Sequence, residues 1–212
     1  MKLSTIAIIF ISIAIIVSSA YFKSLKEGLT NKNTIILMGD SVLNNSKFVP
    51  AGKTVYDFLK QKVSNVVNVA KDGATISDLY SQLDQIPIEL NSDNTFVFIS
   101  IGGNNILKSN PIQTNKLFNE FTAFLDALRA KLNNVRVNIL NLYLPSNPQF
   151  EVYAPIVNRW NQLIQQSSTK VGAMYSVIDI HALLTNPSDF VYDIEPSETA
   201  SEKIAYLIYL SR

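Results

Sequence analysis

Two patterns of apolar residues alternate along residues 33–212. Short continuous apolar runs, mostly rich in β-branched residues, are typical of strands that are buried on both faces of a sheet. They predict five strands, over residues 34–38, 66–70, 95–101, 135–140 and 175–180. Other segments carry apolar residues at helical spacing and predict helices over residues 55–63, 76–86, 114–132, 156–169 and 198–210.

The order of these segments predicts the fold class. Strands that alternate with helices are joined by right-handed crossovers into a parallel sheet with helices on both faces. We therefore predict an α/β fold with three α/β/α layers and a five-stranded parallel sheet. Ligands of such sheets bind beyond the carboxyl ends of the strands, so we expect functional residues in the loops that follow the strands.

The N-terminal segment differs from the rest of the chain. Residues 3–22 carry no charge, and as a helix they are long enough to cross roughly 30 Å of hydrocarbon. The segment follows Lys2 and ends in small residues, which also fits a cleavable signal peptide. We expect a transmembrane anchor or signal peptide in residues 1–22, a linker in 23–32 and one domain in 33–212. The protein is then either anchored to a membrane by a single span or secreted.

Composition excludes several classes of function. The chain has 18 Lys and Arg against 17 Asp and Glu, interspersed, so we expect no nucleic-acid partner. It has no cysteine and a single histidine, which excludes disulfides, thiol nucleophiles and the common zinc sites. We expect no metal and no other cofactor.

Three loops after predicted strands carry a hydroxyl, a glycine and a carboxamide. Gly39-Asp40-Ser41 follows the first strand, Gly73 the second, and Gly102-Gly103-Asn104-Asn105 the third. A glycine lets the backbone turn tightly and approach a ligand closely, and an Asn side chain offers an N–H donor. Together these groups suit a nucleophile and the donors that stabilise an oxyanion.

In order and in position, these three blocks resemble the first three sequence blocks of the SGNH, or GDSL-type, hydrolases. The resemblance implies a flavodoxin-like SGNH hydrolase fold over residues 33–212. It also implies that Ser41 is the nucleophile, and that its own amide, the Gly73 amide and the Asn104 side chain form the oxyanion hole. Asn105 stands where the family usually has Asp.

The fourth block departs from the family pattern, which is Asp, two residues, then His, usually followed by Pro. The sequence has Asp193-Ile194-Glu195-Pro196-Ser197 here, so the catalytic His is missing. If Pro196 sets the register, Glu195 replaces the His and Tyr192 the Asp. If Asp193 sets it, the loop is one residue short.

Two groups are candidates for the base that activates Ser41. Glu195 would need a pKa about two units above its usual value to match a histidine, and Asp193 beside it could supply the charge that raises it. The single histidine, His181, directly follows the fifth predicted strand and is the second candidate. It lies outside the matching block, which favours a structural role for it.

The sequence therefore predicts a serine esterase or acylhydrolase. It would cleave a small carboxylic ester, such as an O-acetylated sugar or a lipid, through an acyl-Ser41 intermediate, with the N-terminal segment contacting a membrane. The alternative is a catalytically silent SGNH domain that binds an acyl or carbohydrate ligand, or a protein partner at a membrane surface. The sequence does not indicate an oligomeric state.

Overall fold

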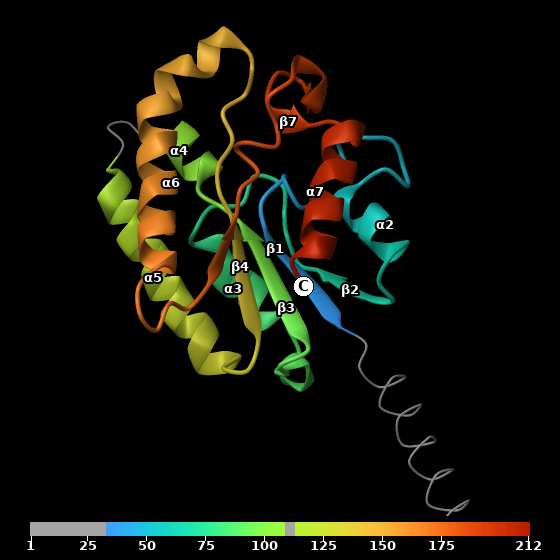
Figure 1. The fold of residues 1–212 in the computed structure, drawn as a ribbon, viewed down its shortest axis with the longest axis vertical. Helices are drawn as coiled ribbons and strands as arrows, with labels where there is room; N and C mark the ends of the chain where they lie inside the picture. The colour runs from blue at the N-terminus through green and yellow to red at the C-terminus, as the bar shows by residue number, and fades with distance from the viewer. Residues whose placement is uncertain (1–32, 109–112) are drawn as a thin grey trace, which may run out of the picture. The chain divides into compact units, whose positions relative to one another are not determined.

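A computed structural model describes residues 33–108 and 113–212 (Figure 1). Five parallel strands form one sheet in the order β2-β1-β3-β4-β5. They are β1 (Thr34–Gly39), β2 (Asn65–Asn68), β3 (Thr95–Ser100), β4 (Arg136–Leu140) and β5 (Ser176–Ile178). The predicted three-layer α/β fold with a five-stranded parallel sheet is confirmed. Strands β3, β4 and β5 lie inside their predicted ranges, and β1 and β2 each extend one residue beyond theirs.

Helices cover both faces of the sheet. They are α2 (Val55–Lys60), α3 (Asp78–Asp84), α4 (Gly103–Lys108), α5 (Thr114–Lys131), α6 (Ala154–Ser168) and α7 (Glu198–Leu210), with 3₁₀ turns η1 (Ile88–Leu90), η2 (Pro148–Tyr153) and η3 (Pro187–Asp189). Helix α4 was not predicted from the sequence. The predicted anchor or signal peptide and the linker lie outside the described residues. Within the residues that are described, no helix is long and apolar enough to cross a membrane.

Strand β1 shows why the predicted strands are continuously apolar. Ile36 and Met38 belong to one hydrophobic cluster, which α3, α5 and α6 complete, and Ile35 and Leu37 belong to a second, which α2 and α7 complete. Successive side chains of a strand point to opposite faces, so a strand between two helical layers buries both sets. Figure 1 shows these two layers on either side of the sheet.

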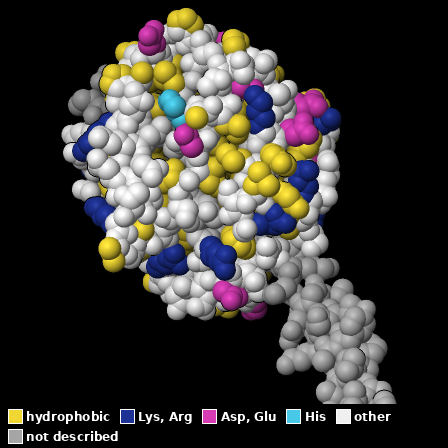
Figure 2. All heavy atoms as spheres, viewed as in Figure 1, with side chains coloured by type: hydrophobic (Ala, Val, Ile, Leu, Met, Phe, Trp, Pro, Cys, Tyr) yellow, Lys and Arg dark blue, Asp and Glu magenta, His cyan; other side chains and the backbone are white. Residues whose placement is uncertain are grey.

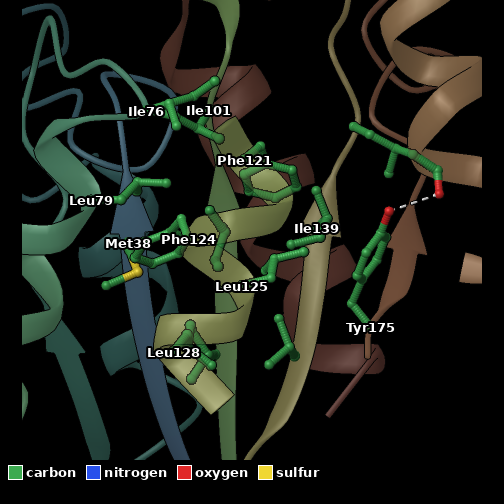
Figure 3. Packing of buried hydrophobic residues seen from close by; sticks show 14 of the residues in the cluster. Met38, Ile76, Leu79, Ile101, Phe121, Phe124, Leu125, Leu128, Ile139 and Tyr175 are labelled. Atoms are coloured by element: carbon green, nitrogen blue, oxygen red, sulfur yellow. Dashed lines mark hydrogen bonds between the residues drawn. The ribbon is translucent and has the colours of Figure 1, made fainter. Parts of the chain in front are cut away.

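The larger cluster is built around α5. Its residues Phe121, Phe124, Leu125 and Leu128 lie against the sheet, as Figure 3 shows, and each is at most 1% exposed. Burial of such side chains stabilises the fold by about 1.5–3 kcal/mol each. At the edge of this cluster the Tyr175 hydroxyl donates to the carbonyl of Ile164 at 3.0 Å, so its polar end is satisfied.

A close approach between β1 and β3 fixes the carboxyl end of β1. Gly39 has φ +121°, and a Cβ built on it would lie 1.8 Å from the carbonyl oxygen of Ser100, so only glycine fits. The next amide, of Asp40, donates to the same Ser100 carbonyl at 3.0 Å. The glycine of the first block therefore sets the path of the backbone into Ser41.

A small hairpin that was not predicted precedes α7. Its strands β6 (Phe190–Val191) and β7 (Glu195–Pro196) pair antiparallel. Between them Tyr192 and Asp193 have φ of 49° and 67°, and the Ile194 amide donates to the Val191 carbonyl at 3.2 Å. Two consecutive positive φ values with this hydrogen bond correspond to a type I′ turn, which usually carries Asn and Gly. This turn delivers Glu195 to the carboxyl edge of the main sheet.

Candidate active site

Ser41 lies in the loop directly after β1, at the carboxyl edge of the sheet. It is 8% exposed and lines a cavity of about 80 Å³. Asn104, at the start of α4, and Glu195, in β7, line the same cavity. Three segments that are far apart in the sequence thus bring a hydroxyl, a carboxamide and a carboxyl group together.

Glu195 is the carboxyl group that faces the nucleophile. Both residues line the cavity, and the Ser41 hydroxyl interacts with the Glu195 carboxyl group in the sense that favours its ionised form. Burial raises the pKa of Glu195 above its ordinary value of 4.5, the interaction with the Ser41 hydroxyl opposes this rise, and the charge of Asp72 adds to it. The Oε2 atom of Glu195 is buried and has no hydrogen-bond partner among the described residues. A carboxylate in this state is a stronger base than a solvated one, and it has a free oxygen.

A second buried carboxyl group, Asp40, lies beside this pair. It is 3% exposed, and its Oδ1 accepts hydrogen bonds from the Val42 amide at 3.2 Å and the Ser100 hydroxyl at 3.1 Å. Burial raises the pKa of Asp40 to about 7, and the charge of Glu195 contributes to the rise. A negative charge on Glu195 therefore makes ionisation of Asp40 less favourable.

Tyr143 fixes the backbone next to Glu195. Its hydroxyl donates to the carbonyl of Ile194 at 2.8 Å. Burial raises the pKa of Tyr143 well above 10, and the charges of Glu195 and Asp40 act in the same direction. Tyr143 therefore stays protonated at neutral pH and keeps this hydrogen bond.

Three N–H groups are candidates for an oxyanion hole. The backbone amides of Ser41 and Gly73 have no acceptor among the described residues. The Asn104 side chain donates one of its two N–H bonds to the carbonyl of Ala74, at 3.1 Å, and keeps the other free. Gly73 is not among the residues that line the cavity, whereas Ser41 and Asn104 are. Asn105, which stands where the family usually has Asp, accepts a hydrogen bond from the Ile76 amide at 3.0 Å. This bond connects the loop after β2 with the segment after β3.

The other two candidate site residues do not line the cavity. His181 directs Nδ1 at the carbonyl of Leu142, at 3.0 Å, which assigns the proton to Nδ1, and its backbone amide donates to Asn141. Asp193 is exposed at the tip of the hairpin. The neighbouring charge that raises the pKa of Glu195 comes from Asp72 rather than from Asp193.

Sequence reasoning missed two residues that hold the site in place. Tyr143 lies in the loop after β4 and has no neighbouring motif that marks it. Gln82 is 2% exposed and hydrogen-bonds both backbone groups of Gly39. A signal for Gln82 was present, because it is a polar residue on the apolar stripe of α3, beside the buried Leu79 and Leu83.

Solved structures with this fold come from several bacteria. A member of the lipolytic G-D-S-L family from Veillonella parvula is 19% identical, with a TM-score of 0.66 over 82% of this chain and 94% of that one. The psychrotrophic esterase EstA from a Pseudoalteromonas species is 19% identical, with a TM-score of 0.62 over 84% and 96%. The lipase Lip_vut3 from a goat rumen metagenome is 18% identical, with a TM-score of 0.66 over 84% and 96%. At these identities the likeness concerns the fold.

No curated protein matches the sequence. The model of the GDSL-like lipase/acylhydrolase family matches residues 37–199, which include Ser41, Asn104 and Glu195. The chain belongs to the GDSL-like lipase/acylhydrolase family of ester hydrolases.

Proposed function

We propose that this chain is a serine esterase in which Ser41 is the nucleophile and Glu195 is the base. The observation that carries the proposal is that Ser41 and Glu195 line the same cavity, where the Ser41 hydroxyl interacts with the half-buried Glu195 carboxyl group. A serine hydroxyl needs a base close to it, and Glu195 lines the same cavity and interacts with the Ser41 hydroxyl.

In the first step, Ser41 Oγ attacks the carbonyl carbon of the ester and its proton passes to Glu195. The carbonyl oxygen becomes an oxyanion, which accepts hydrogen bonds from the free Asn104 N–H and the Ser41 amide. The tetrahedral intermediate collapses, the bond to the alcohol oxygen breaks, and the alcohol leaves with the proton from Glu195. The product is an ester of the acyl group with Ser41.

In the second step, water replaces the alcohol. Glu195, ionised again, accepts a proton as the water oxygen attacks the acyl carbon. The bond to Ser41 Oγ breaks, Glu195 returns the proton to Oγ, and the carboxylic acid leaves. Each proton that Glu195 accepts is therefore returned within the same half-reaction.

The cavity supports a short acyl group as the substrate. Its volume is about 80 Å³, and a water molecule needs roughly 10–15 Å³ on this measure, so the cavity holds about six groups of that size. Apolar side chains, among them Leu144, Phe150 and Val157, form much of its wall. This size and polarity favour acyl chains from acetyl to about six carbons.

We also propose that residues 1–22 bring the domain to a membrane or export it, as their uncharged sequence indicates. Both locations place the esterase where an O-acetylated sugar or a lipid ester is available.

Labelling with a serine-reactive fluorophosphonate tests the function directly. We expect the full chain to be labelled once, and Ser41→Ala not to be labelled at all. Ser46→Ala, which removes an exposed hydroxyl from the same loop, is the matched control and should be labelled like the parent. Absence of labelling in the parent, together with hydrolysis of p-nitrophenyl acetate no faster than that of Ser41→Ala, would favour the silent binding domain instead.

A further inference from the structure

A second cavity lies at the opposite end of the sheet from Ser41. Its volume is about 500 Å³, within the range of sites that bind small molecules. It is lined where β3, β4 and β5 begin, by residues that include Phe96, Arg136 and Ser176. The proposed esterase chemistry uses none of these residues, so the proposed function does not explain this cavity.

Arginine is concentrated at this cavity. The sequence contains four arginines, and three of them, Arg129, Arg136 and Arg212, line it. Its lining residues include no Asp or Glu. The chain has a net charge of only +1, so three arginines at one cavity are a local concentration of positive charge. Figure 2 shows Lys and Arg side chains along the lower part of the domain, with Asp and Glu side chains just below them.

These guanidinium groups retain free donors. Arg129 uses two of its five N–H donors, for the carbonyls of Val135 at 2.8 Å and Met174 at 2.5 Å. Arg136 lies over the Phe96 ring, 5.2 Å from its centroid, and donates no hydrogen bond to any described residue. Arg212 stacks on Tyr209 and donates to that residue's carbonyl. Packing thus holds the groups in place without using all of their donors.

Asn138 supplies an independent observation. It is 7% exposed, lines this cavity, and its side-chain amide makes no hydrogen bond to any described residue. Among the described residues, the buried side-chain atoms without a hydrogen-bond partner are Trp160 Nε1 and Glu195 Oε2, so the Asn138 amide is open to solvent in the cavity and can donate to a ligand there.

We propose that this cavity binds a phosphate group, as a free phosphate or as the headgroup of an anionic lipid. Arginine's planar set of donors matches phosphate oxygens, and Asn138 can donate to one of them. A lipid headgroup is considered as a source because the uncharged sequence of residues 3–22 is typical of a membrane anchor or a signal peptide.

The test uses the full chain in nonionic detergent micelles. Binding of inorganic phosphate is measured by calorimetry, and the unfolding temperature is then compared in mixed micelles that contain phosphatidylglycerol or phosphatidylcholine. The test variants are the double substitution Arg136→Gln with Arg212→Gln, and separately Asn138→Asp, which places a carboxylate in the cavity. The matched control is Arg159→Gln, which changes the one arginine that lies elsewhere, on the exposed side of α6.

Saturable phosphate binding that is at least tenfold weaker in both test variants and unchanged in Arg159→Gln supports the site with free phosphate as its source. Stabilisation by phosphatidylglycerol alone, lost in both test variants and kept in Arg159→Gln, supports it with a lipid headgroup. The proposal is overturned if neither ligand acts, or if Arg159→Gln weakens the response as much as the test variants do. None of these readouts depends on hydrolysis, so they stand apart from the proposed esterase activity.

Discussion

The side-chain amide of Gln82 makes two hydrogen bonds to the backbone of Gly39, which precedes the nucleophile by two residues. The Gly39 amide donates to Gln82 Oε1 at 2.7 Å, and Gln82 Nε2 donates to the Gly39 carbonyl at 2.8 Å. Both residues are buried, so no water can replace these contacts without a change in packing. A side chain of α3 thus fixes the end of β1 from the neighbouring layer.

We therefore expect Gln82→Met to lower the free energy of unfolding by about 2 kcal/mol, because it leaves the buried Gly39 amide without an acceptor. Urea denaturation measures the change. Gln85→Met is the matched control, since Gln85 is exposed and bonds only to the Ser81 carbonyl of its own helix. An equal loss of unfolding free energy in both variants would show that the hydrogen bonds to Gly39 add no stability beyond that of an exposed glutamine.

Glu195→Gln should remove the acidic limb of the pH profile of kcat/KM, because an amide cannot accept the Ser41 proton. In the parent this limb should lie above pH 4.5, in the direction in which burial and Asp72 move the pKa of Glu195. Rates with p-nitrophenyl acetate between pH 4 and 9 measure it. His181→Ala is the comparison: if it abolishes activity while Glu195→Gln keeps the parental profile, His181 is the base.

Asp40→Asn should change how stability depends on pH. An unfolded Asp releases its proton near pH 3.8, but the folded Asp40 releases it near 7. Between these values the folded state holds one more proton, so the stability that Asp40 contributes is complete below pH 3.8 and is lost as pH rises through 7. The parent should lose about 2–3 kcal/mol between pH 5 and 8 from this group, and the variant should not.

Urea midpoints at pH 5, 6.5 and 8 test this expectation. Asp193→Asn, which removes an exposed carboxyl group instead, should keep the parental slope. If the stability of Asp40→Asn depends on pH as strongly as that of the parent, then Asp40 in the parent is ionised throughout this range.

Asn104→Ala should lower kcat by roughly a hundredfold with the KM nearly unchanged, because an oxyanion donor acts mainly in the transition state. Some loss of stability is expected too, since the bond to the Ala74 carbonyl is also removed. Asn105→Ala removes the neighbouring amide, which holds the Ile76 backbone, and serves as the comparison. A smaller effect on kcat from Asn104→Ala than from Asn105→Ala would exclude Asn104 from the oxyanion hole.

A fragment of residues 33–212 should fold and remain soluble without the preceding segment. The chain separates into Met1–Lys32 and Asn33–Arg212, and both hydrophobic clusters lie in the second part. Cooperative thermal unfolding and a monodisperse gel-filtration peak would bear this out. Aggregation of the fragment under conditions in which the full chain is soluble would contradict it.

The sequence predicted the main sheet because its strands are buried on both faces, and continuous apolar runs such as that of β3 follow from this burial. The hairpin escaped prediction because Tyr192 and Asp193 occupy positions that usually carry Asn and Gly. Because the turn carries no recognisable motif, the sequence left two registers open for the fourth block against the family pattern.

Within the site, Ser41 and Asn104 could be predicted because each follows a strand in a recognisable motif. The electrostatic pairing of Asp40 with Glu195 could not, because it depends on burial and on a contact between segments about 150 residues apart. The groups that lie near Glu195 depend on how the loops fold. The sequence around Asp193 shows only which residues are next to Glu195 along the chain.

A carboxylate base also changes where charge resides during the proposed reaction. When a neutral imidazole accepts the serine proton, a cation and an oxyanion appear together from uncharged groups. When Glu195 accepts it, the base becomes neutral as the oxyanion forms, so a single negative charge moves from one side of the cavity to the other. A small cavity with largely apolar walls is poorly suited to separating opposite charges, but it can accommodate the migration of one.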